Sequence, residues 1–370
     1  MGAENTEKIE IGVSPSNGAN GKEKFDYRGF CAALYDDGVT KKSESNNVAD
    51  FFQMISKAEV AWIDYVVDDF ENESLKIAQS LGFSELLAKN MLKCTGSGYE
   101  DFLNEVGILL PAMRVSGFEV NLDPLLILIK KNAIVTIHTR ETKRFFRVRR
   151  YAETLLRKFP KKTEQNDKIT LLLARIIDEN NARNFDHLRE IEEQGDKMSQ
   201  DLSDPKTPRQ VLGPKIYQMK HALIVYLGGL WSTVDALNSI RYGDADLLTD
   251  DDRVLGRISG LLGEVHSQIG LAEHLSEVLA SGLEVLQSIY NNQLQVLNNR
   301  LAMLAAYLAI ISTALLVPNT IATIAGNEMF GFTSGDITWY LTMLVISAVL
   351  GTIATWAILK KSGLLPSKPE

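Results

Sequence analysis

Cysteine is scarce in this chain: only Cys31 and Cys94 occur among its 370 residues. They are far apart and neither belongs to a CxxC pair, so their spacing matches no zinc or iron–sulfur site. Both stand in segments that we interpret as core. The five histidines form no HExxH motif. These absences exclude a disulfide-stapled secreted domain and a metal centre built on either residue type, and they fit a reducing compartment.

Phosphate-binding loops and an excess of basic residues are missing as well. The chain contains neither GxGxxG nor GxxxxGKS/T, so nothing in it predicts a nucleotide site. Its formal net charge of -8 offers no basic face to a nucleic acid and instead favours cations as ligands. No nucleophile, phosphate loop or metal-ligand set stands out before residue 140. We therefore expect no enzyme activity, no organic cofactor and no nucleic-acid partner.

Proline is absent between Pro214 and Pro318. Apolar residues recur at helical spacing from about Asp251 onward, which predicts one helix of roughly 75 residues, about 110 Å long. A bilayer core of about 30 Å can hold only the end of such a helix. The rest must lie on the soluble side.

Two runs without charged residues follow one another near the C-terminus, at 301–325 and 337–359. Each is long enough to cross a bilayer as a helix, and Trp and Tyr residues near the ends of the second run are typical of interfacial anchors. The connecting segment 326–336 has acidic residues and no Lys or Arg, whereas basic residues flank the two spans. The positive-inside rule predicts an outer loop at 326–336 and both termini in the cytosol. The expected location is the cytoplasmic (inner) membrane of a prokaryote.

The chain before the spans divides into three parts. Residues 1–24 are polar and rich in Gly, Asn and Ser, which predicts a disordered cytosolic tail without a signal peptide. Residues 25–140 alternate between strand and helix patterns, which predicts a cytosolic α/β domain. Its expected strands are 27–35, 60–67, 102–115, 125–130 and 133–138, the last two forming a hairpin, and its expected helices are 47–57, 73–81 and 84–92.

Residues 141–300 predict a helical stalk domain. We expect a basic helix at 143–158, one long acidic helix at 164–202, and an antiparallel helix at 209–242 before the long helix begins. We interpret the basic residues of the first helix as a solvated face; the alternative is a lipid or regulatory surface. Residues 360–370 form a short basic cytosolic tail.

A polar series with a spacing of seven runs through the end of the long helix, interrupted only by Ala306. An apolar series with the same spacing lies beside it. Residues seven apart share one face in a left-handed helix bundle, so several copies around an axis would form polar rings separated by apolar constrictions. The alternative is that both series pack helices together. The candidate pore-lining residues are Asn292, Asn299, Met303, Ile310, Thr313, Val317 and Thr320, with Asn327 at the outer end.

The order of these parts resembles the CorA family of divalent-cation transporters. Several short stretches agree with that family: WID at 62–64, KNAIVTIHT at 131–139, the paired asparagines around 291–299, and Pro318, Thr320 and Gly326 at the outer mouth. The resemblance covers nearly the whole chain from Phe25. It implies a CorA-like funnel: an α/β cytosolic N-terminal domain, long stalk helices and two C-terminal transmembrane helices, assembled as a homopentamer in the lipid bilayer.

The outer motif departs from the Gly-Met-Asn signature of that family. The chain reads Gly326-Asn327-Glu328-Met329, so either Asn327 or Glu328 takes the place of the family's asparagine. We prefer Asn327 because it continues the polar series. A neutral amide ring suits hydrated Mg²⁺, which dehydrates reluctantly, whereas a carboxylate ring would bind many cations. Gly326 and Asn327 are thus the expected selectivity filter, with Glu328 just outside it at the outer mouth, and a zinc-transporting relative is the nearest alternative.

The resemblance also implies feedback by cytosolic cations. Candidate regulatory ligands are acidic or imidazole side chains on the long helix and in the α/β domain, although a solvated helix face explains any one of them equally simply. The candidates are Glu264, His266, Glu273, Glu277, Glu100 and Asp101. Lys360 and Lys361 after the second span predict a basic collar at the inner mouth.

The expected function is inward conduction of a partly hydrated divalent cation, Mg²⁺ first and also Co²⁺ or Ni²⁺, down its electrochemical gradient. A second hypothesis is a membrane scaffold or ion sensor that kept the fold and lost transport. Ion flux through the purified protein distinguishes the two.

Overall fold

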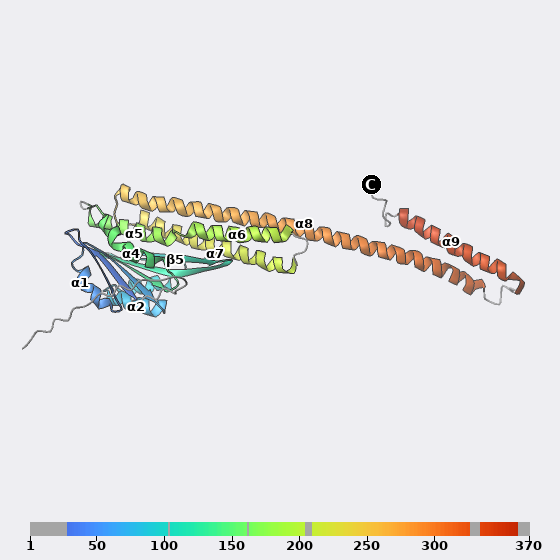
Figure 1. Ribbon diagram of the computed structural model, residues 1–370, viewed down its shortest axis with the longest axis horizontal. Coiled ribbons are helices and arrows are strands. Elements are labelled where there is room, and N and C mark those ends of the chain that lie inside the picture. The colour runs from blue at the N-terminus through green and yellow to red at the C-terminus, as the bar shows by residue number, and fades with distance from the viewer. Residues whose placement is uncertain (1–27, 103, 161–162, 204–208, 326–333, 362–370) are drawn as a thin grey trace, which may run out of the picture. The chain divides into compact units, whose positions relative to one another are not determined.

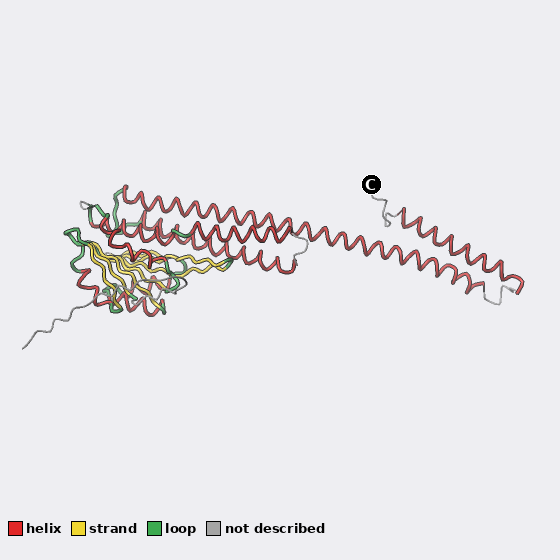
Figure 2. The backbone as a smooth tube through the Cα atoms, in the orientation of Figure 1, coloured by secondary structure: helices red, strands yellow, loops and turns green. Residues whose placement is uncertain are grey.

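The structure of the protein is a computed structural model that describes residues 28–102, 104–160, 163–203, 209–325 and 334–361. It separates into two units, Met1–Glu277 and Val278–Glu370. Figure 2 shows that the strands belong to one sheet and that the chain after it is helical.

The first unit is built on a seven-stranded sheet of order β2-β1-β3-β7-β6-β5-β4. Only β3 and β7 pair in parallel among the described strands, and the β6–β7 hairpin turns at Lys131 and Asn132. The strands are β1 (Gly29–Leu34), β2 (Thr40–Ser45), β3 (Val60–Val67), β4 (Gly98–Phe102), β5 (Glu105–Ser116), β6 (Glu119–Lys130) and β7 (Ala133–Thr139).

Helices cover both faces of this sheet. Figure 1 shows α1 and α2 on one side and α4, α5 and α7 on the other. Because side chains alternate along a strand, Ile63 and Tyr65 of β3 pack with Leu87 and Met91 of α3, whereas Trp62 faces the opposite layer with Phe30. The helices of the first layer are η1 (Val48–Phe51), α1 (Phe52–Ile55), α2 (Phe70–Ser80) and α3 (Glu85–Lys93).

The second layer and the remaining helices follow the sheet in sequence. The helix α8 begins in the first unit and ends in the second. The helices are α4 (Arg144–Arg157), α5 (Gln165–Asn181), α6 (Asn184–Ser203), α7 (Arg209–Tyr242), α8 (Asp252–Ala325), η3 (Ser334–Asp336) and α9 (Ile337–Lys361).

The single acidic helix expected at 164–202 is wrong, because α5 ends at Asn181 and α6 starts at Asn184. A tertiary contact occupies the junction: the Tyr226 hydroxyl of α7 donates to the Asn184 carbonyl at 3.0 Å, and Asn184 Nδ2 donates to Gln268 Oε1 of α8 at 3.1 Å. The strands β2 and β4 were also not expected. By contrast, the strand at 60–67, the β6–β7 hairpin, the helix at 209–242 and the roughly 75-residue helix are confirmed.

The solvated interpretation of the basic helix agrees with the exposure of Lys143, Arg147, Arg150, Arg157 and Lys158 and is wrong for Arg149. Arg149 of α4 lies buried against the sheet, where its Nε donates to Asp64 Oδ2 of β3 at 2.7 Å. Asp64 also accepts from the Thr136 hydroxyl at 2.5 Å and lies 3.2 Å from His138 Nε2 of β7. Trp62 Nε1 donates to the same hydroxyl at 3.1 Å. These contacts form a buried polar network that fixes α4 to two central strands.

Burial alone would raise the pKa of the Asp64 carboxyl. The charges of Arg149 and His138, with the hydrogen bonds from His138 and Thr136, outweigh burial and hold this pKa well below its ordinary value. The stability contributed by the carboxylate is therefore complete above the ordinary pKa of aspartate and is lost only in strong acid.

Candidate functional site

In the part of the chain that the structure describes, three helical segments are long and apolar enough to cross a membrane. They are Leu212–Tyr242 within α7, the helix α8 and the helix α9. The apolar window of α7 is 50% buried in the protein, because this helix packs on β4, β5 and β6. The windows of α8 and α9 are 6% and 0% buried. Exposed apolar side chains over the length of a bilayer core need a lipid or helix partner. The end of α8 and α9 are therefore the candidate membrane spans.

Within the second unit, α9 packs against the end of α8 (Figure 1). A Cβ atom at Gly351 of α9 would lie only 3.3 Å from Val317 Cγ2 and 3.5 Å from Thr313 Cγ2 of α8. Further along, the Tyr340 hydroxyl of α9 donates to the Ala322 carbonyl of α8 at 3.2 Å. A glycine at the point of closest approach lets two membrane helices touch backbone to side chain. We call this contact, from Thr313 to Ala322, the α8–α9 seam.

The predicted pore residues of α8 divide into two groups. Asn292, Asn299 and Thr320 are exposed in the single chain. Met303, Ile310, Thr313 and Val317 are partly buried, and the last two lie at Gly351 in the seam. The threonine hydroxyls donate to carbonyls one turn back, Thr313 to Ala309 at 2.9 Å and Thr320 to Leu316 at 2.8 Å. A role in the pore stays a prediction for every member of the two groups.

Helix packing in the seam is a second explanation for the seven-residue spacing along α8. Ala306, which interrupts the polar series, is only 4% exposed and is the most buried position of the apolar segment. A small residue at a buried position is the kind of sequence signal that indicates helix packing. The predicted residues of the filter and outer mouth, Gly326, Asn327 and Glu328, lie outside the described residues.

The predicted basic collar stands at the end of α9. Lys360 and Lys361 are both exposed in its last turn. The Lys360 ammonium lies 4.9 Å from the centre of the Trp356 ring, a cation–π contact that is typical of a membrane interface.

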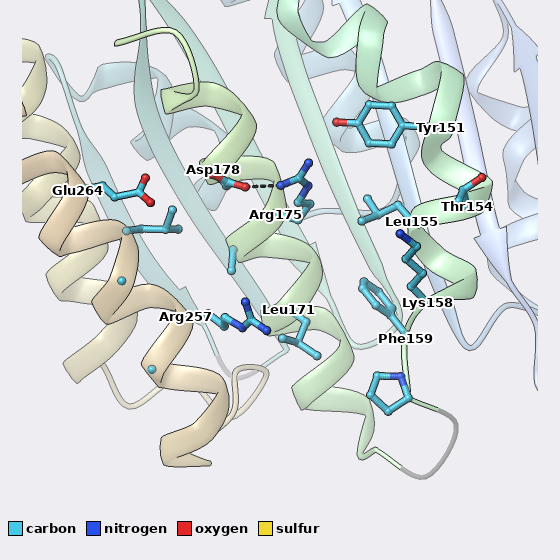
Figure 3. Close-up of a pocket in the computed structure, with 15 residues that line it drawn as sticks. Tyr151, Thr154, Leu155, Lys158, Phe159, Leu171, Arg175, Asp178, Arg257 and Glu264 are labelled. Carbon is cyan, nitrogen blue, oxygen red and sulfur yellow. Dashed lines mark hydrogen bonds and ion pairs between the residues drawn. The ribbon is translucent and has the colours of Figure 1, made fainter. Parts of the chain in front are cut away.

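Of the predicted regulatory residues, Glu264 is placed beside a pocket. This pocket has a volume of about 860 Å³ and lies between α4, α5 and α8 of the first unit. Figure 3 shows Glu264 and Arg257 on α8, with Arg175 and Asp178 forming an ion pair on α5. Acidic and basic side chains alternate around it, so Glu264 lacks the purely anionic surroundings of a divalent-cation site.

The other regulatory candidates lie on the long helix α8 and on strand β4. His266 Nδ1 lies 2.7 Å from the Leu262 carbonyl, and the ring packs edge-on against Trp231. Glu273 and Glu277 are exposed on α8. Glu100 accepts a hydrogen bond from Asn90 Nδ2 at 3.0 Å. Among the residues that the structure describes, no three His, Cys, Asp or Glu side chains are grouped closely enough to hold a metal ion.

Asp101 has acidic neighbours in its own chain. Burial first, and then the charges of Asp246 and Asp244 in the α7–α8 loop, raise the pKa of the Asp101 carboxyl. The same loop caps α8, because Asp251 Oδ1 accepts from the Arg253 amide at 2.7 Å. The sequence pointed to both segments, but it could not show that the β4 carboxylate faces this loop.

Comparison with known proteins supplies the decisive observation. The family model described as CorA-like Mg²⁺ transporter protein matches residues 57–361. The chain belongs to this family. The match spans strands β3 to β7, the stalk helices and both candidate membrane spans, so the chain is a member of the CorA family of divalent-cation transporters.

Solved structures agree on the fold. The complete structure of the CorA magnesium transporter from Methanocaldococcus jannaschii matches with a TM-score of 0.65 and 18% identity, covering 92% of this chain and 100% of that one. The full-length CmaX protein matches with a TM-score of 0.54 and 16% identity, covering 92% of this chain and 99% of that one. No curated protein matches the sequence. At these identities the solved structures support the CorA architecture, and they carry no residue roles to this chain.

Proposed function

We propose that this CorA-family protein conducts a partly hydrated divalent cation into the cytoplasm, with Mg²⁺ as its main substrate and Co²⁺ and Ni²⁺ as further substrates. The observation that carries the proposal is the family match across the spans, joined to two exposed apolar helices of membrane length. Several copies, five by family resemblance, would surround an axis with α8 innermost. The spans would place both termini in the cytosol.

The residues of this pathway would act in sequence. Glu328 outside the filter gathers cations, and Gly326 and Asn327 hold the hydrated ion through neutral oxygens. Thr320 and then Thr313 continue the polar path, and Asn299 and Asn292 follow below the membrane. Met303, Ile310 and Val317 would close it by excluding water. Lys360 and Lys361 around the inner mouth would restrain cation flow. Two charges crossing ~100 mV gain about 4.6 kcal/mol, which drives uptake without ATP.

Flux into proteoliposomes tests this proposal. Purified full-length protein should admit Mg²⁺ when the lumen is held negative, and empty liposomes should not. A preference for Zn²⁺ over Mg²⁺ would favour the zinc-transporting alternative, for which Glu328 in the outer motif is the supporting observation. If none of Mg²⁺, Co²⁺, Ni²⁺ or Zn²⁺ enters, the transport proposal is wrong and a scaffold or sensor role takes its place.

For regulation we propose Asp101 with the α7–α8 loop as the place where cytosolic cations act. The raised pKa of the Asp101 carboxyl means that its ionised form is disfavoured in the fold. The repulsion between Asp101 and the two loop aspartates is therefore absent below the ordinary pKa of aspartate, and it grows as the pH rises through the pKa of Asp101 in the fold. Asp101→Asn should therefore raise the melting temperature at pH 7, in the absence of divalent cations, by about 1–2 °C.

Thermal unfolding with and without Mg²⁺ measures this effect. Wild-type protein should be stabilised by Mg²⁺, and Asp101→Asn should lose most of that stabilisation. Asp36→Asn is the matched control, because Asp36 is exposed in the turn after β1. Equal Mg²⁺ stabilisation of Asp101→Asn and wild type would remove Asp101 from the regulatory site.

A further inference from the structure

A second pocket of the first unit carries positive charge in an acidic protein. It has a volume of about 680 Å³ and lies between the ends of β5 and β6, the turn from β7 to α4, and the start of α6. Five positive side chains and three negative ones line it. Arg114 and Arg140 are paired with Asp123 and Asp68. Arg144, Arg183 and Lys143 are then left with Glu141 and Glu190, so the pocket keeps a net positive charge.

Arg144 is a largely buried cation with neutral partners. Its Nη2 donates to the Met113 carbonyl, and its Nη1 donates to Asn180 Oδ1 at 3.5 Å. Within the described chain no carboxylate forms an ion pair with Arg144 or with Arg183. Burial lowers the pKa of Arg144 to about 10, and the charge of Arg183 acts in the same direction. The charges of Glu179 and Asp123 oppose this shift only in part. A buried guanidinium without a direct ion pair is costly unless an anion accompanies it.

Two buried polar atoms of the pocket also have no partner. The Thr142 and His187 side chains line it and are only 4% and 8% exposed. Thr142 Oγ1 and His187 Nδ1 have no hydrogen-bond partner among the described residues. Burial first, and then the charges of Arg144 and Arg183, lower the pKa of His187 to about 4, so the imidazole ring is neutral at pH 7. Buried hydroxyl and imidazole groups normally find partners, so these two atoms indicate a ligand that supplies acceptors.

We propose that this pocket binds a small phosphate-bearing anion. Arg144 and Arg183 would neutralise its charge, and the Thr142 hydroxyl and the Nδ1–H tautomer of His187 would donate to its oxygens. A tetrahedral oxyanion suits this set, since guanidinium groups match phosphate geometry and all four side chains line one pocket. The pocket is larger than inorganic phosphate requires, which leaves room for an organic part beside Met113. The site is independent of the ion pathway.

Isothermal titration of full-length protein in detergent tests the site. Inorganic phosphate serves as the probe for a free anion and glycerol 3-phosphate as the probe for a phosphate ester, with chloride at matched ionic strength as the reference. Both probes should bind saturably. Arg183→Gln should weaken binding by about tenfold or more, as expected when a charged donor is lost. Arg183 is exposed, so its substitution should leave the fold intact. Arg189→Gln is the matched control, because Arg189 lies on α6 outside the pocket.

Three results would overturn the proposal. One is the absence of heat above the chloride reference with either probe at millimolar concentration. Another is equal weakening by Arg183→Gln and Arg189→Gln, which would show an ionic-strength effect without a site. The third is that wild-type protein binds no phosphate and Arg183→Gln dissociates the oligomer. In that case the anion in the pocket would be a carboxylate from a second copy of the chain. Because the readout is binding and not flux, failure here leaves the transport proposal unaffected.

Discussion

Replacing Arg149 by methionine is expected to destabilise the first unit by ~3–5 kcal/mol, because it leaves the Asp64 carboxylate buried without its counter-charge. The melting temperature of the full-length protein should fall by roughly 10 °C. Tryptophan fluorescence can follow the transition, since Trp62 is buried and donates to Thr136 in the same network. The loss should be smaller at pH 5 than at pH 8, because Arg149 is the largest charge that opposes burial, and without it the pKa of the Asp64 carboxyl rises and protonation relieves the buried charge.

Two further variants separate the effect of the buried charge from other effects of the substitution. Arg157→Met makes the same change at an exposed position at the end of α4 and should cost little. The double variant Asp64→Asn/Arg149→Met removes both charges, so its loss should be smaller than the sum of the two single losses. Additive losses would mean that Arg149 contributes packing against Phe30 and Phe146 and that its charge has no stabilising role.

Replacing Asn327 by alanine is expected to reduce Mg²⁺ flux into proteoliposomes by at least about tenfold. If Asn327 holds the hydrated ion, each subunit loses an oxygen ligand, and losing one hydrogen bond to a charged group already corresponds to about that factor. Asn319→Ala is the matched control: Asn319 is exposed on α8, and it lies outside the seven-residue series. Unchanged flux through Asn327→Ala would remove the filter assignment without affecting transport itself.

The same assay separates pore lining from helix packing along α8. Thr320 is exposed, and Thr313 lies at Gly351 in the α8–α9 seam. If Thr320 faces the ion, Thr320→Ala should change flux or ion preference at constant stability. If packing is the main role of Thr313, Thr313→Ala should lower thermal stability and alter selectivity little. The reverse pattern would exchange the two roles.

The sequence predicted the elements whose signals are local and periodic. The buried strand Val60–Val67 is a continuous apolar run apart from Asp64, and α8 lacks proline over most of its length. The edge strand β2 reads TKKSES, which is polar and exposed, so its pairing with β1 left no hydrophobic pattern to detect. No proline or glycine marks the end of α5 at Ala182 and Arg183. Contacts from α7 and α8 fix this turn, so the sequence carries no local signal for it.

In the candidate site as well, local sequence signals predict some features, and contacts between distant segments determine the others. The apolar spans follow from composition alone, and the structure places both outside the buried core. Which face of α8 meets α9 depends on a partner helix about 35 residues away, so the seven-residue spacing could indicate either a pore or a seam. For the same reason, the sequence does not show which basic side chain of α4 faces the sheet. Seven basic residues between Lys143 and Lys158 look alike in sequence, and only the position of Asp64 in the sheet singles out Arg149.

Gly351 also constrains how the membrane hairpin can move. The side chains of Thr313 and Val317 lie where even one added methyl group would be crowded. A twist of α8 about its own axis would carry these two branched side chains across the α9 backbone, and close-packed contacts of this kind do not deform continuously. We therefore expect the two helices to tilt or slide together when the conformation changes. The hinge for such a motion must then lie outside the seam.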